Sequence, residues 1–90
     1  MNTICIHCFV SGRVQGVFYR RATFEQAVAR GLTGWVKNHA DGRVEALLCG
    51  ETEAVNAMQD WLWEGSSASK VTGVDAREVA WQELTDFEVR

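Results

Sequence analysis

The sequence predicts a single α+β domain over residues 1–90, with an antiparallel sheet and two helices on one of its faces. The main observation is the order of the periodic segments, in which a strand, helix, strand pattern occurs twice. The second observation is the length of 90 residues, of which 47% are hydrophobic, because a chain of this size forms one core.

The first strand, helix, strand unit occupies the N-terminal part of the chain. Residues 3–11 alternate as a strand does, and the more apolar face is expected to meet the core. That face carries Ile4, Ile6, Cys8 and Val10. Apolar residues then recur at three- and four-residue steps over 19–30, which predicts a helix that ends at Gly31. Residues 32–38 are predicted to form the second strand.

The second and third strands are predicted to form a hairpin. The dipeptide Asp41-Gly42 is a strong turn signal between the strand-like segments 32–38 and 43–49. This places the end of one strand beside the start of the next.

The rest of the chain supplies a second helix and two more strands. Thr52 is a suitable N-cap for a helix over 52–64 that carries its own apolar stripe. A loop of glycine, serine and alanine follows at 65–69. A fourth strand is expected within 71–81, and a short one at 87–90.

This order of elements is that of the ferredoxin-like, split βαβ arrangement. Right-handed crossovers would place the first and third strands side by side and antiparallel in the centre of the sheet. Both helices would then cover one face and leave the other partly open. Many unrelated activities share this fold, so the fold alone does not predict a function.

The charge of the chain excludes several classes of partner. Its net charge is -3 with a pI near 5.3, whereas long nucleic acids and anionic membranes call for a basic surface. There is no run of about 18 apolar residues, and the N-terminus does not resemble a signal peptide. We therefore expect a cytoplasmic protein that binds neither nucleic acid nor membrane.

The loop between the first strand and the first helix carries the strongest chemical signal. It reads Gly12-Arg13-Val14-Gln15-Gly16-Val17-Phe18-Tyr19-Arg20. Backbone N–H groups in such a loop and in the first turn of the helix can converge on an anion. The arginine fork of Arg20 can donate two parallel hydrogen bonds to a phosphate. The glycine spacing matches neither a nucleotide P-loop nor a dinucleotide-binding fingerprint. On these residues alone, an ordinary connecting loop with a solvated arginine remains open.

This loop resembles the first signature of the acylphosphatase family. A second signature follows in the right order: Gly34-Trp35-Val36-Lys37-Asn38, then Gly42-Arg43-Val44, then Gly50. The resemblance spans nearly the whole chain. It implies an enzyme that hydrolyses the carboxyl–phosphate anhydride bond of acylphosphates to a carboxylate and inorganic phosphate.

The resemblance also implies a division of labour among the residues. The phosphoryl group would be held by the loop and one arginine side chain, that is, by Gln15, Gly16, Val17, Phe18, Tyr19 and Arg20. Asn38 would orient the attacking water. No metal, cofactor or covalent intermediate is implied, and the partner would be a small acylphosphate that the enzyme hydrolyses. We expect the protein to be a monomer. The acyl group stays open among acyl, carbamoyl and aspartyl phosphates.

Two other functions are weighed against this one. The first is a binding module of the kind found fused to further segments in carbamoyl-handling maturation proteins, but this chain has no such segments. The second is a single-strand RNA binder, which the acidic charge and the single aromatic residue Phe9 on the open sheet face oppose.

Several side chains near the motifs receive structural interpretations. His39, next to Asn38, is interpreted as a surface histidine and not as a general base. Phe18 and Tyr19 are expected to anchor the loop to the domain. Neither histidine has a partner at metal-binding spacing, so no metal site is predicted.

The three cysteines are expected to serve structure. Cys5 opens the first strand and Cys49 closes the third, and the predicted topology makes these positions neighbours on the same face. A Cys5–Cys49 disulfide is therefore predicted, although disulfides are uncommon in the cytoplasm. Cys8 lies on the opposite face and is expected to be a buried free thiol, which argues against a redox or zinc-binding C-x-x-C motif.

Overall fold

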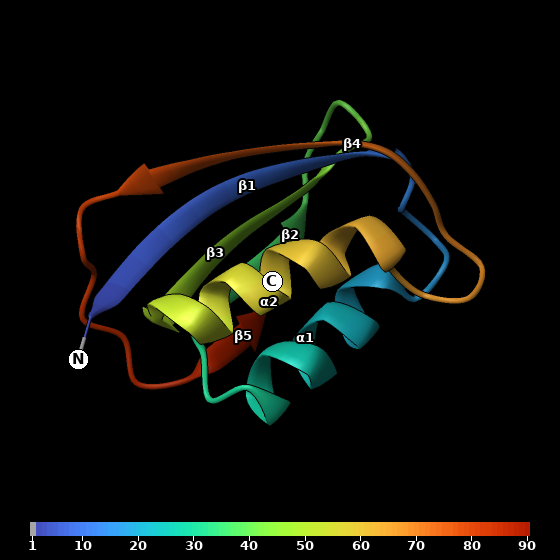
Figure 1. Ribbon diagram of the computed structural model, residues 1–90. Coiled ribbons are helices and arrows are strands. Elements are labelled where there is room, and N and C mark those ends of the chain that lie inside the picture. Colours follow the sequence, from blue (N-terminus) through green and yellow to red (C-terminus); the bar gives the residue numbers. More distant parts are fainter. Residues whose placement is uncertain (1) are drawn as a thin grey trace.

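The computed structural model describes residues 2–90 and contains the predicted elements in the predicted order (Figure 1). They are β1 (Thr3–Arg13), α1 (Tyr19–Ala29), β2 (Thr33–Asn38), β3 (Val44–Glu51), α2 (Thr52–Glu64), β4 (Lys70–Val79) and β5 (Phe87–Val89). The strand-like patterns of residues 3–11 and 43–49 therefore predicted strands correctly. The helical periodicity of residues 19–30 likewise predicted a helix correctly.

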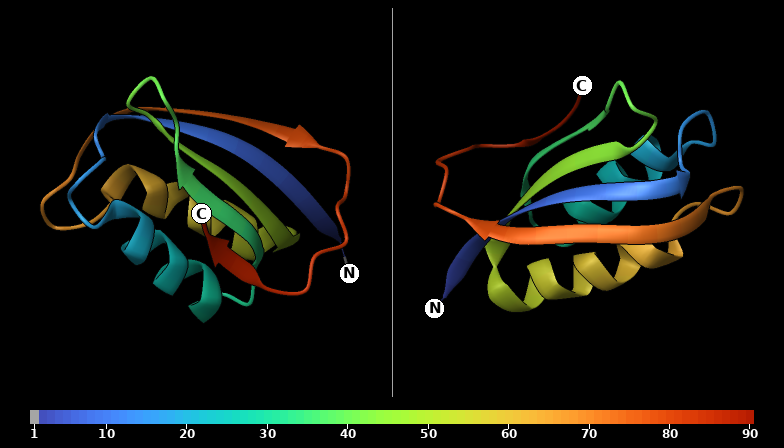
Figure 2. Two further views of the ribbon diagram at one scale, coloured as in Figure 1. Left: turned by 180° about the vertical axis from the view of Figure 1, so that it is seen from behind. Right: turned by 90° about the horizontal axis from the view of Figure 1, so that it is seen from above.

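The five strands form one sheet in the order β4-β1-β3-β2-β5. β1 is antiparallel to both β3 and β4, which confirms the predicted central pair. The predicted antiparallel arrangement holds for β1 to β4, and β5 departs from it because it pairs parallel with β2. The chain crosses from the end of β4 to the far edge of the sheet before β5 begins, so β5 runs in the direction of β2 (Figure 2).

Both helices lie on the same face of the sheet, as predicted (Figures 1 and 2). The expected inner face of β1 is buried there, with Ile6, Cys8 and Val10 in the main core cluster. The apolar stripe of α2 packs against it through Val55, Met58, Trp61 and Leu62. The N-terminal residue of α1, Tyr19, is tied to α2 by a hydrogen bond from its hydroxyl to the carbonyl of Leu62.

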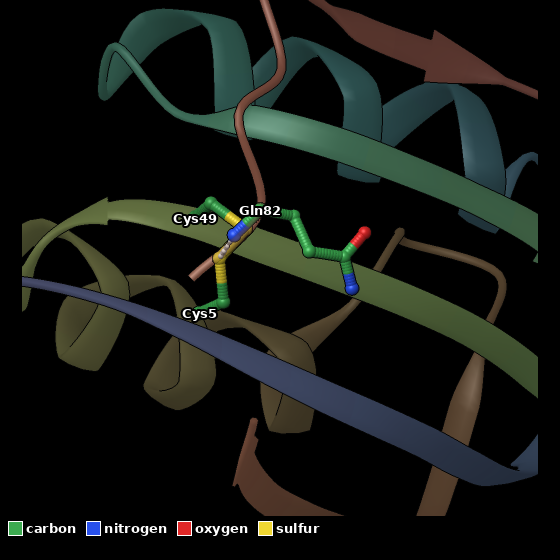
Figure 3. The surroundings of a disulfide bond; sticks show 3 residues. All are labelled: Cys5, Cys49 and Gln82. Carbon is green, nitrogen blue, oxygen red and sulfur yellow. Dashed lines mark hydrogen bonds between the residues drawn. A yellow bond between two sulfur atoms is a disulfide. The ribbon is translucent and has the colours of Figure 1, made fainter. Parts of the chain in front are cut away.

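The opposite face of the sheet is closed at one end by a smaller cluster around Cys5, Leu47 and Cys49. Cys5 lies directly across from Cys49 in the β1–β3 register, with Cα atoms 4.1 Å apart, and the two are joined as a disulfide (Figure 3). The backbone N–H of Gln82, in the segment after β4, donates to Cys5 Sγ at 3.4 Å. Cys8 is a buried free cysteine, as the opposite parity predicted.

Thr52 begins α2 but does not cap it, which corrects the prediction. The N-cap is Glu51, without a side-chain hydrogen bond to the helix, and the Thr52 hydroxyl donates to the carbonyl of Asn2 at 3.3 Å. The backbone N–H of Thr52 also donates to Asn2, at 3.1 Å. Thr52 therefore binds Asn2, the residue just before β1, and this tertiary contact replaces a local cap of α2. No helix within residues 2–90 is long and apolar enough to span a membrane.

Candidate active site

The position of the loop after β1 is set by a bulge at Ser11 and Gly12, where the register between β1 and β4 shifts. Gly12 has φ 119°, and a Cβ atom there would collide with the carbonyl oxygen of Lys70. Only glycine allows this close approach of the two backbones. β1 therefore stays paired with β4 up to Arg13, and the loop that follows leads directly into α1.

The loop presents a group of unpaired backbone donors. Within the described part of the chain, the N–H groups of residues 15–20 make no backbone hydrogen bond, and the first such bond of α1 is from Ala22 to Phe18. No side chain caps α1, and no acidic residue lies in its first turn. These free donors and the positive end of the helix favour an anion.

Two arginines, Arg20 and Arg21, lie in the first turn of α1. Cations are normally unfavourable at a helix N-terminus, because they repel the positive end of its dipole. Their presence here creates a local positive potential in a chain whose net charge is -3. A bound anion would remove this repulsion.

A cavity of about 460 Å³ joins the loop to the end of β2. Its lining comes from the loop, α1, β2 and β5, namely Val14, Gly16, Phe18, Tyr19, Arg20, Arg21, Asn38 and Val89. The structure thus brings together the two side chains that the motifs singled out, Arg20 and Asn38. Two other predicted site residues, Gln15 and Val17, do not line it.

The side chain of Gln15 is turned away from the cavity and ties the loop to the turn after β2. Its Nε2 donates to the backbone oxygens of His39 at 2.9 Å and Arg43 at 3.0 Å. The turn is closed by a hydrogen bond of 2.7 Å from the N–H of His39 to the oxygen of Arg43. Gln15 therefore couples the loop between β1 and α1 to the residue next to Asn38.

A surface ion pair braces the same turn. The guanidinium of Arg43 lies 2.8 Å from a carboxylate oxygen of Asp41, whose other oxygen accepts the backbone N–H of Arg43 at 3.0 Å. The hydrogen bonds from Arg43 hold the pKa of the Asp41 carboxyl well below its usual range. The turn is thus held both by its backbone and by a side-chain pair.

The predicted anchoring role is confirmed for Tyr19. Its side chain is 1% exposed, and its hydroxyl donates to the carbonyl of Leu62 in α2 at 2.7 Å. Burial raises the pKa of the Tyr19 phenol well above its usual range. Val17 is also buried, and its carbonyl accepts a hydrogen bond from the Ser66 hydroxyl at 2.7 Å. Backbone and side chain together fix the loop to α2 and the loop that follows it.

The anchoring role predicted for Phe18 is wrong, because its side chain is 80% exposed. Phe18 has φ 61° and ψ 21°, in the left-handed region. Both of its neighbours, Val17 and Tyr19, are buried, so the chain turns the intervening side chain outward.

A contact that the sequence did not predict involves the end of the chain. Nη1 of Arg20 donates to the main-chain oxygen of Arg90 at 2.8 Å. Arg90 is placed by its own N–H, which donates to Val36 in β2 at 2.8 Å. No local signal near residue 90 indicates this contact, which depends on the parallel pairing of β5 with β2.

The two histidines are held by carboxylates. His7 Nε2 lies 2.7 Å from Glu45, on the sheet face away from the helices, and His39 Nδ1 lies 3.1 Å from Asp41. The His39 side chain is 37% exposed, as expected for a surface position. Within residues 2–90, no group of three or more His, Cys, Asp or Glu side chains is placed to hold a metal ion.

The fold and the cavity together define a small α+β protein whose cavity is lined by two arginines and an asparagine beside unpaired backbone donors. A family model described as Acylphosphatase matches residues 6–89, and the chain belongs to the acylphosphatase family. It is accordingly a hydrolase that acts on acylphosphates.

Individual relatives agree with this assignment. The chain is 50% identical over 86 residues to an acylphosphatase of Nitrosococcus oceani, with 96% of this chain and 97% of the relative covered. It is similar to the solved structure of an acylphosphatase from Coxiella burnetii, with 44% identity, a TM-score of 0.96 and 99% and 94% of the two chains covered. For the acylphosphatase from Bacillus subtilis the identity is 36% and the TM-score 0.94, with 97% and 98% covered.

Proposed function

We propose that the protein hydrolyses the carboxyl–phosphate bond of an acylphosphate by direct attack of water on phosphorus, with no metal ion and no covalent intermediate. The observation that carries this mechanism is the shared cavity of Arg20 and Asn38, which lie on α1 and at the end of β2. One element would bind the phosphoryl group and the other would place the nucleophile.

The phosphoryl group would be held by charge and by preformed dipoles. The free N–H groups of residues 15–20 supply donors, and the Arg20 guanidinium supplies a positive charge and further donors. Gln15 and Val17 would take part through their backbone N–H groups, because their side chains are engaged elsewhere. Phosphoryl transfer depends mainly on such positioning and on stabilising charge in the transition state.

Asn38 would orient the attacking water. It is the exposed last residue of β2, lines the cavity and is held in place by its pairing with Val44 of β3. The water oxygen forms a bond to phosphorus while the bond to the carboxylate oxygen breaks, and the carboxylate leaves with the electron pair. The proton lost by the water ends on phosphate or solvent. A carboxylate is a good leaving group, so no general acid is required, and the cavity lining contains no carboxyl group, histidine or lysine.

We also propose that the protein acts as a monomer without a nucleic-acid partner. Arg20 and Asn38 meet on one cavity within a single chain, so the proposed site needs no residue from a second copy, and the net charge of -3 opposes binding to a polyanion. A single species of monomer mass in sedimentation, unchanged by added RNA, is the expected result.

The mechanism is tested by phosphate release from acetyl phosphate in excess EDTA. We expect full activity, because no step requires a metal ion. Inactivation by EDTA that a divalent cation reverses would contradict the mechanism. Arg30→Ala, a change at the C-cap of α1 and away from the cavity lining, is the control for variants of Arg20.

A further inference from the structure

Phe18 is unusual in two independent respects. With 80% of its side chain exposed, it is the most exposed large hydrophobic residue within residues 2–90. It is also the one non-glycine residue in that range with a positive φ, at 61°. A bulky side chain in the left-handed region costs free energy, and burial of the ring does not compensate for it. Such strain is concentrated at functional sites in proteins.

Phe18 is one of several apolar residues that line the cavity. Val14 and Val89 line the same cavity, and Val89 is itself 47% exposed. Arg20, Arg21 and Asn38 contribute the polar groups, and no carboxylate is among the lining residues. The cavity is therefore amphipathic, with apolar side chains beside the groups that would hold a phosphoryl group.

We propose that Phe18 and Val89 form the surface that receives the acyl group, and that the preferred substrates are acylphosphates with an apolar or aromatic acyl group. This proposal rests on the proposed function, because it assumes that the phosphoryl group is bound by the 15–20 loop. An apolar acyl group gains free energy when it leaves water to contact these side chains. A carbamoyl group, which is small and polar, gains nothing comparable.

The loop geometry explains why the ring is at this position. Val17 and Tyr19 are buried on either side and fix the backbone, so the Phe18 side chain is carried on a rigid support at the rim of the cavity. A rigid aromatic side chain offers contact area with little loss of conformational entropy on binding.

The test compares kcat/KM for benzoyl phosphate and acetyl phosphate, whose leaving carboxylates have similar basicity. The ratio of the two isolates the contribution of the acyl group from that of the phosphoryl group. In Phe18→Ala we expect the benzoyl-to-acetyl ratio to fall by about three- to tenfold, the range of one aromatic contact. Trp63→Ala, which removes an aromatic residue that is 54% exposed on α2 outside the cavity, should leave the ratio unchanged.

A second variant separates the acyl contact from the conformation of the loop. Phe18→Gly suits a φ of 61° and preserves the turn, so it should lower the ratio as much as Phe18→Ala does. An unchanged ratio in both variants would overturn the proposal, whatever their absolute activities. Equal losses on both substrates in Phe18→Ala, restored by glycine, would assign Phe18 to loop conformation only and would also overturn it. If the unmodified protein hydrolyses neither substrate, the proposed function itself fails.

Discussion

The guanidinium of Arg20 and the main chain of Arg90 are joined by a hydrogen bond of 2.8 Å across 70 positions of sequence. It leaves the remaining N–H groups of Arg20 beside the cavity, and it limits the rotamers that this long side chain can adopt. A fixed guanidinium loses less entropy when it binds a phosphoryl group. β5, a strand of only three residues at the edge of the sheet, thus positions Arg90, which in turn holds the Arg20 side chain.

Replacement of Arg20 by lysine should not preserve activity. An ammonium group keeps the charge but cannot bond Arg90 and a phosphoryl group with the same planar fork. We expect Arg20→Lys and Arg20→Ala both to lose at least about 10²-fold in kcat/KM, the range for loss of one transition-state donor. Both variants should also raise the inhibition constant of inorganic phosphate, and near-normal turnover in Arg20→Lys would contradict the assignment.

Asn38→Ala should lower kcat by about 10²-fold and leave the inhibition constant of inorganic phosphate nearly unchanged, since an interaction with the attacking water acts mainly in the transition state. The matched control is His39→Ala, which alters the adjacent side chain but leaves Asn38 in place. Turnover retained with phosphate affinity lost would reverse the roles that we propose for Asn38 and Arg20.

Gln15→Ala should reduce both stability and turnover. The change removes two hydrogen bonds and leaves the backbone oxygens of His39 and Arg43 without this donor. We expect a loss of about 1–3 kcal/mol in the free energy of unfolding, measured by urea titration. A fall in kcat should accompany it, because the turn next to Asn38 is no longer tied to the loop. Gln59→Ala, whose amide bonds only the exposed Asn56, is the control and should change neither quantity.

The disulfide predicts a count of reactive thiols. The unreduced protein, once unfolded, should show one thiol, that of Cys8, and the reduced protein three. In the folded state Cys8 should not react with iodoacetamide at neutral pH, because burial raises the pKa of its thiol to about 12.

Reduction of the disulfide should destabilise the fold without touching the site. The bond spans 44 positions of sequence, for which the loss of unfolded-chain entropy corresponds to about 4 kcal/mol. Thermal unfolding with and without reductant measures the change. Activity at low temperature should be retained, since neither Cys5 nor Cys49 lines the cavity. Three thiols in the unreduced, unfolded protein would exclude the bond.

The elements that could be predicted from the sequence are those with a local signal. The alternation of residues 3–11, the helical periodicity before Gly31 and the Asp41-Gly42 turn are each visible over a few neighbouring residues. The strand parity of Cys5 and Cys49 was also sufficient to pair them, because the order of elements restricts the sheet to few topologies.

Within the site, residues that belong to contiguous motifs could be predicted from the sequence, whereas contacts between distant segments could not. Arg20 and Asn38 could be singled out because each belongs to a contiguous motif, and the structure places both on one cavity. The outward Phe18 could not be predicted, since its left-handed conformation follows from the burial of both neighbours. The hydrogen bonds of Gln15 to the turn at 39–43 likewise have no counterpart in local pattern.

The sequence by itself determined the class of fold, the family and the residues of the two motifs, because periodicity and motif spacing are properties of neighbouring positions. Only the tertiary structure decided that β5 runs parallel to β2, that Arg90 holds Arg20 and that Val89 joins the cavity. The reason is physical: a three-residue strand has too few side chains to specify a partner. Its place is set by the burial of Phe87 in the core and by the hydrogen bonds that the free edge of β2 offers.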